Sequence, residues 1–309
     1  MAGQDVLAAR FEAQRSRLGQ IAYRMLGSLP EAEDAVQESW LRLGRVDADR
    51  VENLAAWLTT VVSRVCLDML RSRTARREDP AGSELPDRAP DTGGGSDPEH
   101  EAFLVDSVGR ALLVVLDRLG PAERVAFVLH DSFAVPFDAI APIVERSPVA
   151  TKKLASRARQ KVRGTPAVPA AEVARQRRVV EAFLAAARGG DLRALLEVLA
   201  PDVVRTADPA ALPPGGVTEL RGARAVAEGT VQLARTARFA APALVDGRVG
   251  IVVAPHGRLR LVLTVATEGD RITGYQVLAD PARLRRLDLG ALDRTGPGQS
   301  GHDQAATMY

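Results

Sequence analysis

Residues 147–164 form a basic segment whose side chains can donate hydrogen bonds to a polyanion. Lys152, Lys153 and Lys161 are the only lysines in the 309-residue chain, whose 41 basic residues are otherwise arginines. Six basic residues and no acid lie between Lys152 and Arg163, counting both ends. Lysine and arginine bind phosphates and donate to guanine, and glutamine pairs with adenine. The segment therefore predicts a contact with nucleic acid.

On an α-helix, successive residues turn by about 100°, which divides this segment into two faces. Ala150, Leu154, Ala158 and Val162 fall on one apolar face, with Arg157 and Lys161 flanking it. The opposite face carries only donors and positive charge: Lys152, Lys153, Ser156, Arg159, Gln160 and Arg163. A solvated surface face is the alternative, but such faces usually mix charges of both signs. A short helix at 136–144 and a turn at 145–147 precede the segment and complete a helix-turn-helix, so DNA binding is favoured.

A second basic cluster follows Trp57 in a long segment of helical periodicity. Asp68 is the only acid between Arg64 and Arg77, and the cluster's arginines are Arg64, Arg71, Arg73, Arg76 and Arg77. Arginine fits phosphate, and an aromatic ring nearby can stack on an unpaired base. Burial in the core is the alternative for Trp57, and it is the common fate of a tryptophan on an apolar stripe.

An acidic face precedes this cluster on the helix that starts near residue 31. It contains Glu31, Glu33, Asp34 and Glu38. Acids beside a DNA-binding element repel phosphate, so the face indicates a protein partner. The alternative is a role in helix-dipole stabilisation and solvation alone.

These side chains are positioned by two helical regions, and a region with a different pattern follows them. We expect a multidomain chain of two all-α domains, the second with the helix-turn-helix, followed by an α+β domain. The boundaries are a helical domain at 1–77, a flexible linker at 78–100, a helical domain at 101–165, the α+β domain at 171–290 and a disordered tail at 291–309. The linker contains Gly93–Gly95, but no strand precedes them and no Gly-Lys-Ser/Thr follows, so they do not indicate a phosphate-binding loop.

The α+β domain begins with helices and ends with strands. Hydrophobic periodicity predicts helices at 172–188, 192–199 and 222–235. Alternation and turn residues predict strands at 203–206, 248–254, 258–267 and 271–278, the last three as an antiparallel meander with turns at Gly257 and Gly269.

Composition excludes several other classes of protein. A single cysteine, Cys66, rules out an intrachain disulfide and argues against a zinc site built on paired cysteines, so we expect no metal and no cofactor. No apolar run is long enough to span a bilayer and the N-terminus has no signal-peptide core, so a cytoplasmic location without membrane contact is expected.

The helical regions resemble an extracytoplasmic-function (ECF) sigma factor of the sigma-70 superfamily. The residues that carry the resemblance are YRMLGSLPEAEDAVQESWLR at 23–42, AAWLTTVVSRVCLDMLRSR at 55–73, and LDRLGPAERVAFVLHDSF at 116–133 with the basic segment. The resemblance implies that Asp34, Gln37, Glu38 and Leu41 dock on the clamp helices of the RNA polymerase core. It implies that Trp57, Arg64 and the run from Arg71 to Arg77 handle the melted downstream promoter element. The upstream element would be met by Thr151, Lys152, Lys153, Ser156 and Arg157, and we add Arg159.

The third domain resembles the cone-shaped SnoaL-like fold that one ECF subgroup carries as a fused regulator. The similar segments are AAARGGDLRALLEVLAPDVV at 185–204 and DPARLRRL at 280–287. Two subgroup motifs are altered: only Glu84-Leu-Pro-Asp remains in the linker, and Thr206-Ala-Asp-Pro replaces a glycine-rich motif. The resemblance implies a transcription initiation factor whose third domain modulates its activity, and whether that domain binds a small molecule stays open.

Two other classes of function compete with this reading. A cone of this kind can hold an enzyme's acid and base, and the available groups are Asp208, Asp246, His256, Asp270 and Tyr275. Several of them fall at expected turns, where solvated polar residues belong, so we expect no catalytic residues. A one-component helix-turn-helix regulator with a ligand-binding cone is the other alternative, but it has no need of the acidic docking helix.

Overall fold

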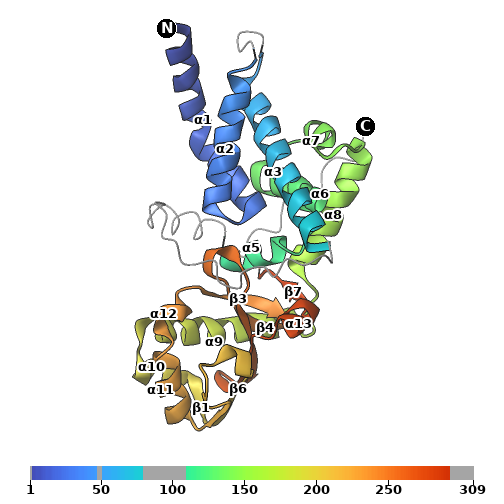
Figure 1. Cartoon of the computed structure of the whole chain (residues 1–309). Helices are drawn as coiled ribbons and strands as arrows, with labels where there is room; N and C mark the ends of the chain where they lie inside the picture. Colours follow the sequence, from blue (N-terminus) through green and yellow to red (C-terminus); the bar gives the residue numbers. More distant parts are fainter. Residues whose placement is uncertain (1, 47–50, 79–108, 293–309) are drawn as a thin grey trace.

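The computed structural model describes residues 2–46, 51–78 and 109–292, which form a helical half and a sheet domain (Figure 1). Helices fill the described chain up to Arg163, and a sheet with covering helices follows from Ala170. The expected order of helical domains before an α+β domain is confirmed. Nearly all of the predicted linker and all but two residues of the predicted tail lie outside the described residues.

The first helical unit contains α1 (Ala2–Leu26), α2 (Leu29–Leu43) and α3 (Leu54–Glu78). Gly27 ends α1 with a φ of 72°, and Pro30 lies in the first turn of α2, where a missing N–H leaves no helical bond unmade. The three helices pack together around buried side chains that include Phe11, Ile21, Met25, Val36, Leu43, Leu58 and Val62.

The second helical unit contains the helix-turn-helix. Its elements are α5 (Arg110–Leu116), α6 (Pro121–Phe127), the π-helical turn η2 (Val128–Ser132), α7 (Phe137–Val144) and α8 (Pro148–Arg163). Glu145 begins the turn after α7 in the left-handed conformation, with a φ of 58°. Ser147 then caps α8, because its Oγ accepts a hydrogen bond from the Ala150 amide at 3.2 Å.

The two helical units pack directly on each other. Helix α3 contacts both α6 and α7, and Figure 1 shows it alongside them. Buried apolar side chains of both units belong to one continuous cluster. The two units therefore share a core, a contact that sequence periodicity did not predict.

The sheet domain contains a seven-stranded sheet with the order β2-β1-β6-β5-β4-β3-β7. Its strands are β1 (Leu199–Ala207), β2 (Glu219–Arg221), β3 (Ala240–Val245), β4 (Arg248–Val253), β5 (Leu261–Glu268), β6 (Arg271–Leu278) and β7 (Leu289–Gly290). The predicted meander corresponds to β4–β5–β6, and β1 pairs with β6 in parallel. Sequence patterns missed β2, β3 and β7.

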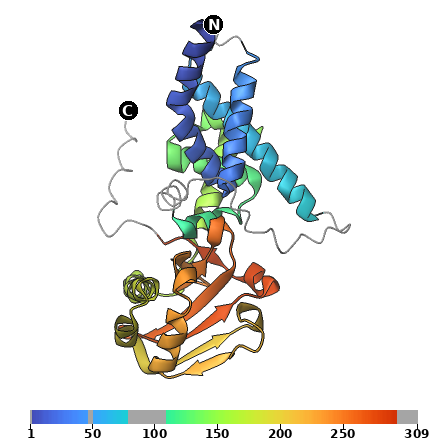
Figure 2. The ribbon, with the colours of Figure 1, turned by 60° about the vertical axis from the view of Figure 1, so that its left-hand side comes forward.

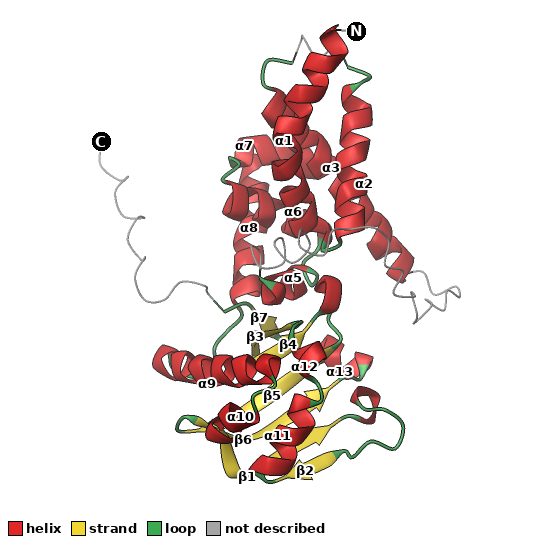
Figure 3. Cartoon of the chain, turned by 90° about the vertical axis from the view of Figure 1, so that its left-hand side faces the viewer, coloured by secondary structure: helices red, strands yellow, loops and turns green. Residues whose placement is uncertain are grey.

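The two faces of the sheet pack against different partners. Leu244 and Ile251 face an apolar cluster shared with α9 (Ala170–Gly189), α10 (Leu192–Val198) and α11 (Ala223–Val231). The alternate residues Val245 and Val252 join the cluster of the helical half. Figure 3 shows α9 lying across the sheet. Figure 2 shows the sheet domain below the helical half. Two short helices complete the domain, α12 (Ala234–Ala237) and α13 (Pro281–Arg286).

A backbone seam joins the sheet domain to the C-terminal end of α8. The Ala167 amide, in the connection after α8, donates to Gly247 O of the β3–β4 turn at 2.8 Å. The Ala291 amide, directly after β7, donates to Val162 O at 2.7 Å. Two further bonds come from Arg118, which donates to the carbonyls of Leu284 and Leu287. The sheet domain is therefore held to the helix-turn-helix at both of its chain ends.

Gly247→Ala is expected to loosen this seam. Gly247 has a φ of 77°, and a Cβ there would lie 2.7 Å from both the Cβ and the amide nitrogen of Ala167. The left-handed strain alone costs about 1–2 kcal/mol, and the collision adds to it. Urea denaturation should show the loss of stability, and limited proteolysis should show cleavage within residues 165–169.

Gly269→Ala provides the matched control. Gly269 also has a positive φ, 54°, but a Cβ there would meet nothing within 4 Å. Equal losses of stability and equal protease resistance in the two variants would show that the contact with Ala167 does not stabilise the seam.

Candidate nucleic-acid interface

Helix α8 has a buried face and an exposed basic face, rotated slightly from the prediction. Its buried residues are Thr151, Ala155, Ala158 and Val162, whereas Ala150 and Leu154 are half-buried. This corrects the expectation for Thr151, whose side chain is fully buried and donates to Ser147 O at 3.0 Å. Thr151 therefore fixes the start of the helix and does not reach its outer surface.

The two ends of α8 differ in how their charges are neutralised. Arg159 Nε donates to Asp131 Oδ1 at 2.5 Å, and Lys161 Nζ donates to Glu123 at 2.7 Å. Both acids belong to the same helical unit, so these cations hold α8 on α6 and η2. Toward the N-terminus, four predicted site residues are exposed: Lys152, Lys153, Ser156 and Arg157. The three cations among these four have no acidic partner within the described part of the chain, so they are free to meet an external anion.

Arg64 and Arg71 of α3 already have internal partners in the helix-turn-helix. Arg64 Nη2 donates to Pro142 O of α7 at 3.3 Å, and Arg71 Nη2 donates to Glu145 Oε2 at 3.2 Å. Trp57 is half-buried and packs against the apolar core. The structure thus brings Arg64 and Arg71 of the second basic cluster against the helix-turn-helix, which the sequence placed in a separate domain.

Arg73 has internal partners within the first helical unit. Its guanidinium donates to Leu26 O at 3.0 Å and forms an ion pair with Glu31. The side chain is only 19% exposed, and the pair joins α3 to α2. In this arrangement Arg73 acts as a structural tie rather than a free phosphate ligand.

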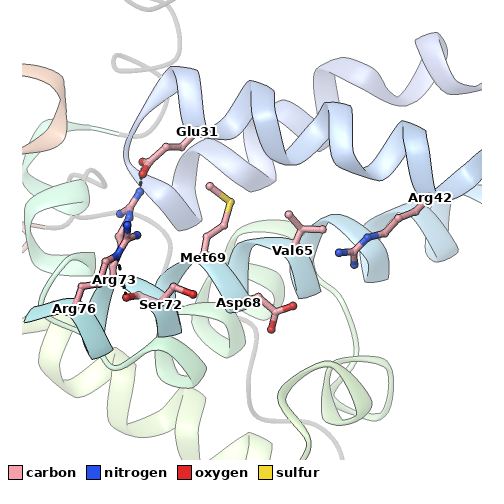
Figure 4. A pocket seen from close by; sticks show the side chains of 8 residues that line it. All are labelled: Glu31, Arg42, Val65, Asp68, Met69, Ser72, Arg73 and Arg76. Atoms are coloured by element: carbon pink, nitrogen blue, oxygen red, sulfur yellow. Dashed lines mark hydrogen bonds and ion pairs between the residues drawn. The ribbon is translucent and has the colours of Figure 1, made fainter. Parts of the chain in front are cut away.

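A groove of 370 Å³ lies between α2 and α3, beside that tie (Figure 4). Val65 and Met69 line it with apolar surface, and Figure 4 shows the Arg73–Glu31 pair at one end and Arg42 at the other. Arg42 Nε donates to Glu38 Oε1 at 2.8 Å. Two of the arginines that line the groove, Arg42 and Arg73, are therefore paired with acids of α2.

The predicted docking face of α2 consists of Asp34, Gln37, Glu38 and Leu41, which are spaced three or four residues apart along one side of the helix. Asp34 and Gln37 are exposed, and Leu41 is 55% exposed on this polar face. An exposed leucine surrounded by acids and an amide can bury apolar surface against a partner while the acids meet its cations.

Sequence reasoning missed the most unusual charge of the molecule, Arg124 of α6. Its side chain is 2% exposed, and its one ion pair among the described residues joins Nη1 to Asp117 Oδ1 at 3.3 Å. Nη2 lies 3.4 Å from the position of a Cβ on Gly27, at the α1–α2 turn of the other helical unit. Burial lowers the pKa of the guanidinium to about 10. The helical period marks position 124 as interior, but nothing in the sequence says which unit covers it.

Three of the five candidate acid and base groups of the sheet domain, Asp208, Asp246 and Tyr275, take part in structural hydrogen bonds. Asp208 accepts from the Ala279 amide at 3.1 Å and the Asp280 amide at 3.3 Å, and it pairs with Arg283. Asp246 accepts from the Asp288 amide at 2.8 Å. Tyr275 shares a hydrogen bond of 3.1 Å with Thr230, and burial raises its pKa. Asp270 lies in the β5–β6 turn, and the side chain of His256 lies outside the described residues.

Among the described residues, no helix combines the length and apolarity needed to cross a membrane. Among the same residues, no three His, Cys, Asp or Glu side chains are grouped to hold a metal ion. The thiol of Cys66 is buried, which raises its pKa to about 12.

Comparisons with known proteins identify relatives of most of the chain. Residues 11–76 match the model of the family Sigma-70 region 2. Over 252 residues the chain is 40% identical to the ECF RNA polymerase sigma factor SigJ of Mycobacterium tuberculosis, covering 80% of each protein. Over 298 residues it is 34% identical to the probable ECF RNA polymerase sigma factor SigI of that species, covering 94% of this chain and 99% of the relative.

A solved structure also resembles the chain. The crystal structure of Mycobacterium tuberculosis SigJ matches it with a TM-score of 0.43 and 33% sequence identity, covering 90% of this chain and 98% of that one.

Proposed function

The chain belongs to the ECF RNA polymerase sigma factors, and we propose that it binds the RNA polymerase core and directs it to specific promoters. The observation that carries this proposal is the division of charge in the helical half. An acidic face with an exposed leucine lies on α2, whereas unpartnered cations lie on α8. A protein that bound DNA alone would gain nothing from the acidic face, because it repels phosphate.

The docking face of α2 is the proposed contact with the clamp helices of the core. Asp34, Gln37 and Glu38 offer acceptors for basic or amide side chains, and Leu41 supplies the apolar centre. Such a face gives both orientation and affinity, because charge complementarity steers the encounter while a buried apolar anchor slows dissociation.

Two surfaces are proposed to read the promoter. The N-terminal half of α8 would lie in the major groove at the upstream element, where Lys152, Lys153, Ser156 and Arg157 can reach base edges and phosphates. Trp57, Arg64 and Arg71 of α3 would meet the melted downstream element once they leave their internal partners. Arg159 and Arg73 support these surfaces through their pairs with Asp131 and Glu31.

The sheet domain is proposed to modulate this activity and not to catalyse a reaction. Asp208 and Asp246 are committed to backbone amides, and the seam fixes the domain against α8. A domain held at the end of the recognition helix can bias how the two helical units are arranged. Such coupling is typically worth about 1–3 kcal/mol, or a few-fold to a hundredfold in activity. The protein would act in the cytoplasm, where polymerase and promoter are found.

Run-off transcription with purified core polymerase tests the proposal. Full-length protein should give transcripts from a selected set of promoter fragments, and core polymerase alone should give none. Tight and sequence-specific binding by the isolated protein, unchanged when core polymerase is added, would contradict it and favour a one-component regulator. A chain ending at Gly164 should change transcript yield, and a yield equal to that of the full-length protein would contradict the modulatory role of the sheet domain.

A further inference from the structure

We propose that the last turn of α7 together with Glu145 acts as an internal substitute for DNA phosphate and holds the free protein closed. This latch, defined as the contacts of Arg64 with Pro142 O and of Arg71 with Glu145, occupies two arginines that would otherwise meet the promoter. The inference rests on the proposed function, because it assumes that these arginines bind DNA when they are free.

The two acceptors of the latch lie within one turn of chain. Pro142 is in the last turn of α7, where carbonyls lack helical partners and the negative end of the helix dipole is located. Its oxygen accepts from Arg64 Nη2 at 3.3 Å, and the carboxylate of Glu145 accepts from Arg71 Nη2 at 3.2 Å. A negative helix end and a carboxylate, spaced to meet two arginines on one face of α3, offer the same type of ligand as a nucleic-acid backbone.

The exposure of the Arg71–Glu145 pair makes it easy to displace. The two side chains are 45% and 71% exposed, so solvent screens their attraction and the pair alone shifts a closed–open equilibrium by no more than about fivefold. A DNA strand, which presents a phosphate for every nucleotide, can therefore compete for both arginines. Apolar contacts of α3 with α6 and α7 supply the rest of the closed interface.

Arg124 destabilises the closed interface at a second point. Its guanidinium is buried where α6 meets the Gly27 turn, and its Nε has no hydrogen-bond partner among the described residues. A buried cation with one long ion pair destabilises the interface that covers it. Separation of the two helical units would return Arg124 to water, so the closed form is poised to open.

Closure also determines what the basic surfaces can reach. With α3 against α7, the surface proposed for the downstream element lies beside the helix-turn-helix that carries the upstream one, so the two could serve only neighbouring stretches of DNA. Opening the latch releases the two arginines and allows the distance between the two proposed surfaces to change.

Distance measurements between spin labels in the full-length protein test the latch. Labels introduced at Ala75→Cys on α3 and Gln160→Cys on α8 occupy exposed sites in the two helical units. The natural Cys66 is fully buried and its thiol pKa is raised to about 12, so it should escape labelling. Glu145→Gln is expected to increase the open population by up to about fivefold, and Glu145→Arg by more, because it places like charges together.

Binding to a fluorescein-labelled single-stranded DNA of mixed sequence provides the second measurement. Both Glu145 variants should bind this DNA more tightly by about the same factor as they open. Glu268→Arg is the matched control, since Glu268 is exposed on the β5–β6 hairpin of the sheet domain, and it should change neither measurement.

Arg71→Gln separates the latch from the proposed function. It should open the protein as Glu145→Gln does, yet weaken DNA binding. If Arg71→Gln opens the protein without weakening DNA binding, the latch stands and the proposed DNA role of Arg71 fails. If Glu145→Arg leaves the distance distribution unchanged, or opens the protein without tightening DNA binding, the latch is overturned.

Discussion

Replacing Lys152 and Lys153 together with alanine is expected to reduce promoter affinity of the polymerase complex by at least about thirtyfold. Both side chains are exposed on the N-terminal half of α8 and have no acidic partner in the described part of the chain. A residue that reads a base contributes about 1–3 kcal/mol, so the loss of two gives at least about 2 kcal/mol. Binding to a promoter fragment and run-off transcription, each at several salt concentrations, would measure the loss.

The salt dependence distinguishes two roles for these lysines. If one of them contacts only phosphate, its single variant should weaken all sequences evenly and lower the salt slope by about one unit. Lys161→Ala is the control, because Lys161 lies on the same helix but is paired with Glu123. Wild-type transcription by the double variant would show that this face of α8 is merely solvated.

Leu41→Arg is expected to weaken binding to the core polymerase by about thirtyfold or more. Leu41 is the apolar centre of the docking face, and central anchors of interfaces commonly contribute at least about 2 kcal/mol. A charge at this position would also be buried without a partner on binding. Titration of labelled protein with purified core polymerase measures the change.

Leu233→Arg provides the matched control for this variant. Leu233 of the sheet domain is 58% exposed, almost the same as the 55% of Leu41, but it lies outside the proposed interface. Both substitutions are on the surface and should leave the thermal midpoint nearly unchanged. Equal polymerase affinity of the two variants would remove α2 as the docking element.

Local patterns were sufficient to predict the helical half. The Pro148 start and Gly164 end of α8 coincide with the observed helix, because a capping serine, a first-turn proline and a terminal glycine act within a few residues. The orientation of that helix was predicted less well. The small residues of α8 do not define a single apolar stripe. Thr151 rather than Ala150 faces the core, where the Thr151 hydroxyl bonds to Ser147 O.

The sheet was predicted only where side chains alternate. Strand β3 reads Ala-Ala-Pro-Ala-Leu-Val, a composition of low strand propensity, and it forms because β4 and β7 pair with its two edges. The signal that could have found it is Asp246-Gly247, whose φ values of 49° and 77° suit the tight turn of a two-residue hairpin. Strands β2 and β7 contain three and two residues, too few for any period to show.

The contacts between distant segments could not be predicted at all. The sequence predicts a DNA contact for Arg64 and a turn at Glu145, but it does not indicate their internal partners, because these are set by how α3 and α7 meet in space. The sequence therefore predicts which basic residues form the proposed DNA-binding surfaces. Only the structure shows that internal acceptors already bind some of them.

The seam at α8 also sets an order of events during synthesis of the chain. Gly164 and Gly290, whose backbones touch there, are 126 positions apart in the sequence. At the usual ribosomal rate of about 5–20 residues per second, the helix-turn-helix emerges roughly 6–25 seconds before the strand that closes against it. During that interval the nascent protein has a complete recognition helix and no sheet domain fastened to its end. The attachment at Gly290 therefore forms only after the recognition helix is complete, and every nascent chain passes through an unfastened form before it.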